Sequence, residues 1–144
     1  MESLLYVSRS TLFMPDDENI VGEIVIQARA RNRALHLTGA LLFTHQHFAQ
    51  YLEGPEAGVA DLMASIRRDP RHTEIEIVAS RRRDSRRFGD WDMGYAGPSE
   101  LVSLPVEAVL GTGSHGATSL SAERLVRLML DLARSAAPRT GVAA

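Results

Sequence analysis

The spacing of hydrophobic and polar positions changes several times along the chain. Residues 4–8 alternate between two faces that are both largely apolar, which is typical of a buried strand. After a run of acidic residues, apolar positions recur at helical spacing and predict a helix over about residues 17–31. Two further apolar runs, residues 37–43 and 48–52, flank a short polar turn and therefore predict a β-hairpin.

The next part of the chain continues this order of elements. A Gly-Pro pair stops the hairpin, and apolar residues at helical spacing predict a helix over about residues 56–68. Residues 74–79 and 91–95 then alternate in polarity and predict two more strands. The order β-α-β-β-α-β with an additional strand is that of a ferredoxin-like α+β fold, in which one sheet carries two helices on one face.

A third helix is predicted near the C-terminal end, over about residues 120–135. One face of this helix carries four apolar residues, Leu125, Leu128, Met129 and Leu132. The helix either caps the open face of the sheet or binds a partner. We therefore expect a core domain over residues 1–97, followed by a linker and a helical extension over residues 98–144.

Composition limits the classes of function. The 144-residue chain has 16 basic residues, all of them arginine, against 18 acidic residues, and its net charge of −2 argues against direct binding to nucleic acid or to a membrane surface. The absence of cysteine excludes disulfides and cysteine-ligated metals. Because the N-terminus lacks the pattern of a secretion signal and no apolar run reaches membrane-spanning length, we expect a cytoplasmic protein.

Three motifs lack the context that their chemistry requires. Residues 111–116 spell G-x-G-x-x-G, but too little chain follows for a second parallel strand, so a flexible linker is favoured over phosphate binding. The arginines within residues 81–87 have no interleaved aromatic residue, which favours a solvated connection over a nucleic-acid site. His45 and His47 have no further ligands in view, so no metal site is predicted.

Two polar side chains occupy strand positions that should be buried. Tyr6 lies on an apolar face of the first strand, and Gln50 lies between two apolar residues on a strand that this topology places beside it. Buried polar groups usually pair locally, so the two side chains satisfy each other or a backbone group, or else they face a polar ligand between the helices. Asn32 either ends the first helix or points along the same groove.

These polar residues belong to a wider pattern. The chain resembles the BLUF family of flavin-binding blue-light sensor domains over about residues 3–97. The matching segments are residues 5–8, 30–32, 37–42, 48–54, 69–72, 86–88 and 91–93. One departure from the family pattern lies outside the expected pocket, where His36 stands in place of a common glycine.

The resemblance implies a role for each polar residue. Tyr6 would be the photochemical electron and proton donor, and Gln50 the amide that switches between Tyr6 and the flavin. Trp91 and Met93 would relay that switch. The implied cofactor-binding residues are Tyr6, Ile24, Arg31, Asn32, Gln50, Asp69, Arg71 and His72. For the last three, a plain helix end is the alternative, because arginine and histidine suit a helix C-terminus.

The function that we expect is blue-light reception by an FAD-binding protein that is not an enzyme, with the FAD held noncovalently between two helices. Its signal would pass by protein–protein contact, through a homo-oligomer or an unidentified downstream protein. One alternative is a small flavoprotein that performs redox chemistry in the dark, and another is an interaction module without flavin. A reversible red shift of the visible absorption after blue light separates the sensor from both alternatives.

Overall fold

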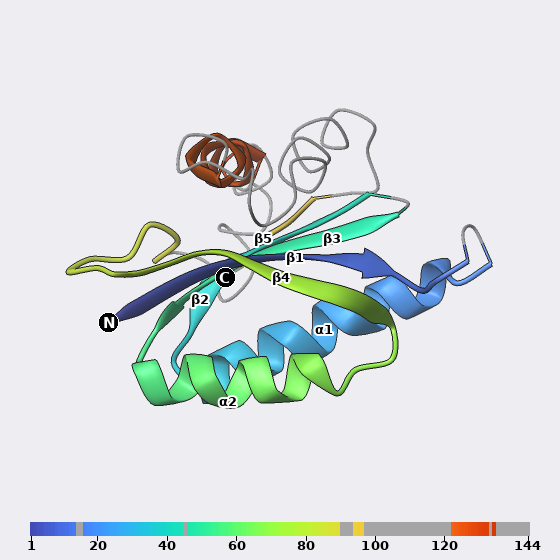
Figure 1. Cartoon of the computed structure of the whole chain (residues 1–144), viewed down its shortest axis with the longest axis horizontal. Coiled ribbons are helices and arrows are strands. Elements are labelled where there is room, and N and C mark those ends of the chain that lie inside the picture. The colour runs from blue at the N-terminus through green and yellow to red at the C-terminus, as the bar shows by residue number, and fades with distance from the viewer. Residues whose placement is uncertain (14–15, 45, 90–93, 97–121, 133, 135–144) are drawn as a thin grey trace.

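The computed structural model describes most of the chain, namely residues 1–13, 16–44, 46–89, 94–96, 122–132 and 134. The elements follow one another in the predicted order (Figure 1). They are β1 (Glu2–Ser10), α1 (Glu18–Ala34), β2 (Thr38–Phe43), β3 (His47–Gly54), α2 (Glu56–Arg67), β4 (His72–Arg82) and β5 (Gly94–Ala96). This arrangement confirms the predicted ferredoxin-like α+β fold.

One sheet of five strands has the order β4-β1-β3-β2-β5. β1 pairs antiparallel with both β3 and β4, β2 pairs antiparallel with β3, and β5 joins β2 in parallel. The register of β1 against β3 sets Tyr6 directly opposite Gln50. Because directly opposed residues on paired strands project to the same face of a sheet, the two side chains emerge side by side.

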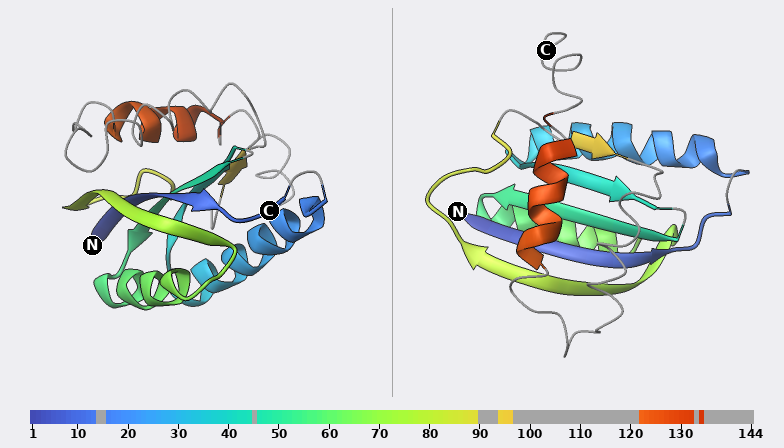
Figure 2. Two further views of the ribbon diagram at one scale, coloured as in Figure 1. Left: turned by 45° about the vertical axis from the view of Figure 1, so that its right-hand side comes forward. Right: turned by 90° about the horizontal axis from the view of Figure 1, so that it is seen from above.

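Both faces of the sheet are covered (Figures 1 and 2). α1 and α2 lie on one face, and the helical residues 122–132 cross the other face. On the α2 side, Leu4 and Leu52 from the central strands pack against Leu62 and Ile66 of the helix. Tyr6 belongs to the same cluster, so the phenol is embedded in the core between sheet and helix.

The C-terminal helix of residues 122–132 caps the open face of the sheet, which was one of the two alternatives left by the sequence. Leu125 and Met129 are completely buried in one hydrophobic cluster with residues of β1, β2 and β3. Leu128 and Leu132 are partly buried and pack against the same cluster. The apolar stripe predicted on this helix is therefore covered to a large extent within the chain itself.

α1 continues beyond its predicted end at Arg31 and finishes at Ala34. Asn32 therefore does not end the helix but lies in its last turn, where its side chain is completely buried. The helix ends where the Leu35 N–H bonds back to the Arg31 carbonyl and His36 adopts a left-handed φ of 59°, a conformation that favours glycine. No helix among the described residues is both long and apolar enough to span a membrane.

Two glycines with very different surroundings give a paired test of this packing. A methyl group added at Gly39 of β2 would overlap the Tyr51 carbonyl of β3, whereas nothing lies within 4 Å of one added at Gly22 of α1. We expect Gly39→Ala to destabilise the fold by about 2 kcal/mol or more, because strand backbone must shift. We expect Gly22→Ala to stabilise it by about 0.5–1 kcal/mol, because alanine is the better helix former. Urea unfolding measures both effects, and changes of the same sign would contradict the packing.

Candidate functional site

A hydrogen bond joins the side chains at the centres of β1 and β3. The Tyr6 hydroxyl donates to Oε1 of Gln50 at 2.5 Å, and both side chains are buried. Burial withdraws the phenol from water and, together with the negative charge of Asp69, raises the pKa of Tyr6 above its usual range. Tyr6 therefore keeps its proton at neutral pH and acts as the donor in this bond.

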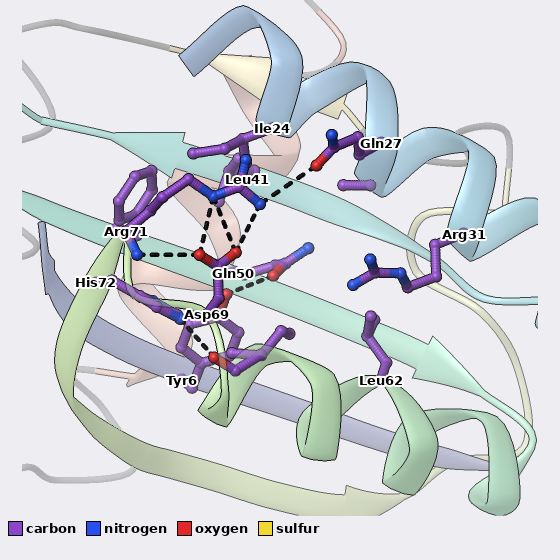
Figure 3. Close-up of a pocket in the computed structure, with 13 residues that line it drawn as sticks. Tyr6, Ile24, Gln27, Arg31, Leu41, Gln50, Leu62, Asp69, Arg71 and His72 are labelled. Carbon is purple, nitrogen blue, oxygen red and sulfur yellow. Dashed lines mark hydrogen bonds and ion pairs between the residues drawn. The ribbon is translucent and has the colours of Figure 1, made fainter. Parts of the chain in front are cut away.

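The Tyr6–Gln50 pair forms part of the wall of a cavity between α1, α2 and the sheet (Figure 3). The lining residues are Tyr6, Ile24, Gln27, Ala28, Arg31, Leu41, Phe48, Gln50, Leu62, Ile66, Asp69, Arg71 and His72. Six of these residues are apolar and come from both helices and from the sheet, and the other seven carry polar or charged groups. A cavity that combines apolar surface with converging polar groups suits a flat heteroaromatic ligand.

The structure brings together seven of the eight residues predicted to bind a cofactor. These are Tyr6, Ile24, Arg31, Gln50, Asp69, Arg71 and His72. Asn32 is not among the lining residues, although it is buried one position beyond Arg31 on α1. The two residues predicted to relay the switch, Trp91 and Met93, lie outside the described residues.

Sequence reasoning missed several of the lining residues. Gln27 lies three positions beyond Ile24, on the same face of α1, and helical spacing was the signal that could have found it. Leu41 is the direct neighbour of Gln50 in the register of β2 against β3. That register depends on the hairpin pairing, so only a committed strand alignment could have identified Leu41.

Asp69 and Arg71 form an ion pair beside the cavity, in the turn after α2. The Arg71 guanidinium contacts the Asp69 carboxylate at 2.6 to 3.1 Å, and the Arg71 backbone N–H donates to it at 3.0 Å. Burial favours the neutral acid, but these hydrogen bonds and the positive charges of Arg71 and His72 lower the pKa of Asp69 overall. Arg71 also donates to Oε1 of Gln27 at 3.3 Å, so the pair ties this turn to α1.

Two hydrogen bonds fix the imidazole of His72 beside Tyr6. Its Nε2 lies 2.8 Å from the Ile66 carbonyl, and its Nδ1 lies 2.7 Å from the Ser8 hydroxyl. Because a carbonyl oxygen only accepts, Nε2 carries a proton, and in the neutral ring Nδ1 accepts from Ser8. The imidazole meets the ring of Tyr6 edge-on at a centroid distance of 6.1 Å. Tyr6 is thus held by the ring of His72 as well as by Gln50.

Comparison with known proteins identifies the family that carries such a site. Residues 1–94 match the family model described as BLUF, sensors of blue-light using FAD. The photoactivated adenylate cyclase subunit beta of Euglena longa is 32% identical over 122 residues, which cover 83% of this chain and 14% of that protein. The blue light- and temperature-regulated antirepressor BluF of Escherichia coli (strain K12) is 42% identical over 76 residues, which cover 51% of this chain and 19% of that protein.

Solved structures share the architecture. The dark-state structure of BlrB, a BLUF protein, is similar with a TM-score of 0.71 and 33% identity, covering 93% of this chain and 96% of that chain. The photo-activated state of BlsA has a TM-score of 0.75 at 22% identity and covers 90% of this chain and 94% of that chain, which shows a common fold.

The chain belongs to the BLUF family, and residues 1–94 form a flavin-binding blue-light sensor domain. The family resemblance stated from the sequence is therefore confirmed. The chain spans less than a fifth of the length of the two curated relatives named above. Those relatives accordingly share the sensor region with this chain over a small part of their length.

Arg71→Gln tests the ion pair beside the cavity. Because the pKa of Asp69 is lowered by folding, the ionised carboxylate stabilises the fold above its ordinary pKa of 3.8, and this contribution is lost as the pH falls through the lowered value. We expect the variant to lose about 1 kcal/mol of stability at neutral pH, and progressively less in acid. Urea unfolding across this pH range measures the difference, with the exposed Arg68→Gln as control. A loss that is independent of pH would contradict the ionic origin.

Proposed function

We propose that this chain is a blue-light photoreceptor that binds FAD noncovalently in the cavity between α1 and α2, and that light rearranges the Tyr6–Gln50 bond. The observation that carries this proposal is the buried hydrogen bond of 2.5 Å between the Tyr6 hydroxyl and Oε1 of Gln50, in the wall of that cavity. A hydrogen-bond switch requires a fixed donor, here the Tyr6 hydroxyl, and a group whose donor and acceptor atoms can exchange positions, here the Gln50 amide.

The residues around the cavity fit a flavin. Ile24, Leu41 and Phe48 supply apolar surface for a flat ring system, while Gln50 supplies an amide for a ring carbonyl or ring nitrogen. Arg31 lines the cavity and is exposed, so its guanidinium stands at the open side, where it suits a phosphate of FAD. The choice of FAD over FMN remains part of the proposal.

Tyr6 and Gln50 divide the work of the switch. A bound flavin would supply the absorption of blue light and an excited ring able to accept an electron from a nearby phenol. Tyr6 is placed to give up its hydroxyl proton along the existing bond to Oε1 of Gln50. Gln50 presents both a donor and an acceptor on one planar group, so rotation or tautomerisation reverses which atom faces Tyr6. Once the electron and the proton have returned to Tyr6, the rearranged amide that remains is the signalling state in this proposal.

Removal of either partner tests the switch. We expect blue light to produce a reversible red shift of the flavin absorption bands in the parent chain, and Gln50→Leu to abolish it. Tyr6→Phe removes the donor and should lower the yield of the shift at least about tenfold. Tyr51→Phe is the matched control, because Tyr51 is also buried but packs in the core on the opposite face of the sheet. The visible spectrum before and after illumination measures all four proteins, and chromatography of the released pigment identifies the flavin.

The alternative, a flavoprotein that performs redox chemistry in the dark, predicts the opposite effect of Tyr6→Phe. A small redox flavoprotein would turn over with a reduced nicotinamide in the dark, and Tyr6→Phe would leave that turnover intact. A parent protein that holds flavin yet shows no change of spectrum under blue light would overturn the proposed switch.

We further propose that the signal leaves the site through β3, by way of Glu53. Gln50 faces α1 and α2, whereas Glu53 is completely buried on the opposite face of the same strand. The Glu53 carboxylate accepts hydrogen bonds from the backbone N–H groups of Arg87 and Phe88 at 2.8 and 2.5 Å. The hydroxyls of Thr38 and Tyr51 also donate to it, at 3.1 and 3.3 Å. Glu53 thus fastens the segment after β4 to the strand that carries Gln50.

This segment also contacts the C-terminal helix. Phe88 is completely buried against the ring of Tyr51, at a centroid distance of 5.1 Å, in the cluster that contains Leu125. Arg87 forms two hydrogen bonds to the Glu123 carboxylate, at 2.7 and 3.0 Å. Contacts therefore run from β3 to the helix of residues 122–132 without a break, and a relay through Trp91 and Met93 stays a prediction beside this route.

The output in this proposal is a protein contact rather than catalysis by this chain. The relatives carry the names of an adenylate cyclase subunit and an antirepressor, so similar sensor regions occur in proteins with different outputs. We propose that this chain signals through a homo-oligomer or a separate downstream protein, with the helix of residues 122–132 as the element that changes. A cytoplasmic location stays a prediction from the sequence.

Glu53→Gln tests the proposed route. The amide keeps one acceptor oxygen but places an NH₂ group against a buried backbone N–H, so we expect a loss of about 1–3 kcal/mol of stability. The light-induced red shift should survive, because Tyr6 and Gln50 are unchanged. Hydrogen exchange of the helix of residues 122–132 should then respond to light in the parent chain and respond much less in the variant. Glu56→Gln, an exposed change on α2, is the control, and a full response in Glu53→Gln would contradict the route.

A further inference from the structure

A second cavity is lined by residues of β1, β4 and the helix of residues 122–132. Figure 2 shows that this helix crosses the face of the sheet opposite α1 and α2. Leu5, Val78 and Val126 give it an apolar part. Three of the arginines from the cluster at residues 81–87 also line it. The prediction that this cluster is a solvated connection is therefore incomplete, because part of it faces a cavity.

The charges around this cavity do not balance. Arg81, Arg83 and Arg87 line it, and Glu123 is the one acidic residue among the described residues that line it, so these lining residues carry an excess of two positive charges. Glu123 is already engaged in the ion pair with Arg87, whose side chain is only 16% exposed. A net positive cavity in a chain of net charge −2 requires a local reason.

Arg83 shows the imbalance most directly. Its side chain is half-buried, and its Nε atom is buried with no hydrogen-bond partner among the described residues. Buried donors of this kind nearly always have a partner, and a charged one is costly to leave without one. The pKa of Glu123 is lowered chiefly by the hydrogen bond from Arg87 and further by the positive charges of Arg87, Arg127 and Arg83.

Arg82, the arginine between Arg81 and Arg83, has an acidic partner. It pairs with Glu56 of α2 at 3.1 Å, on the other side of the sheet. Alternation along an extended chain sends Arg81 and Arg83 to the face covered by the helix of residues 122–132. Arg82 thus has an acidic partner on one face of the sheet, whereas among the described residues neither Arg81 nor Arg83 forms an ion pair on the other. Glu2, which accepts from Ser80 at 2.6 Å, lies near this edge but does not line the cavity.

We propose that this cavity binds a small organic anion, with its carboxylate or phosphate head between Arg81 and Arg83 and its apolar body against Leu5, Val78 and Val126. Guanidinium groups bind both kinds of oxyanion through paired N–H donors, which accounts for arginine at these positions. The site is separate from the flavin cavity, because the sheet lies between the two. Glu123 acts in it as an internal competitor for Arg87.

Titration of the full chain, loaded with flavin and kept in the dark, tests this proposal by calorimetry. The probes are phenyl phosphate, benzoate and inorganic phosphate, so the arms separate the preferred head group from the contribution of the apolar body. We expect one equivalent of the better organic anion to bind about tenfold more tightly than inorganic phosphate. The affinity should fall as the salt concentration rises.

Matched variants assign the binding to this cavity. We expect Arg83→Gln to weaken binding about tenfold and the exposed Arg81→Gln to weaken it several-fold, whereas Arg82→Gln should change it less than about twofold. Glu123→Gln should strengthen binding, because Arg87 is released, and structural damage would not produce that gain. The flavin spectrum should be the same in all four variants, which separates this site from the photochemical one. Absence of saturable binding of every probe at about 10 mM, or an equal loss in Arg82→Gln, would overturn the proposal.

Discussion

The structure depends on a phenol and a carboxamide that are held against each other between the two central strands of the sheet. Neither side chain reaches bulk water, and the Tyr6 hydroxyl finds its acceptor in Oε1 of Gln50 at 2.5 Å. The surrounding core fixes both: Leu4 and Leu52 lie on the same face, and the ring of His72 meets that of Tyr6 edge-on. A cavity wall that contains such a pair is both rigid and able to change state, because only the amide has to rearrange.

The two faces of the sheet have different surroundings. One face holds the cavity between α1 and α2, and the other is covered by the helix of residues 122–132. β3 belongs to both, since Gln50 and Glu53 project from opposite sides of one strand. A buried carboxylate is expensive unless it is well hydrogen-bonded, and Glu53 accepts from two backbone amides and two hydroxyls. The same bonds hold the segment of residues 87 and 88 against the strand that carries Gln50.

The sequence was sufficient for the order of elements and for the central pair, because both follow from short-range periodicity and a known topology. It placed Tyr6 beside Gln50 once the strand order was assumed, and the register confirms that neighbourhood. The predicted end of α1 was wrong, because Asn32 resembled a helix terminator but is buried within the last turn. The ion pair between Arg87 and Glu123 was out of reach, because it joins residues 36 positions apart across a linker without regular periodicity.

The helix of residues 122–132 is a tethered occupant of the open sheet face, with Leu125 and Met129 inserted in the core. A partner protein that binds this apolar surface must compete with the helix of residues 122–132. The effective concentration of that helix is set by the length of the chain that connects it to the sheet. Weak partners therefore do not bind this surface while the helix is packed on the sheet. A modest loosening of the helix would then be enough to change which partner occupies that surface, without a change in the fold of the domain beneath it.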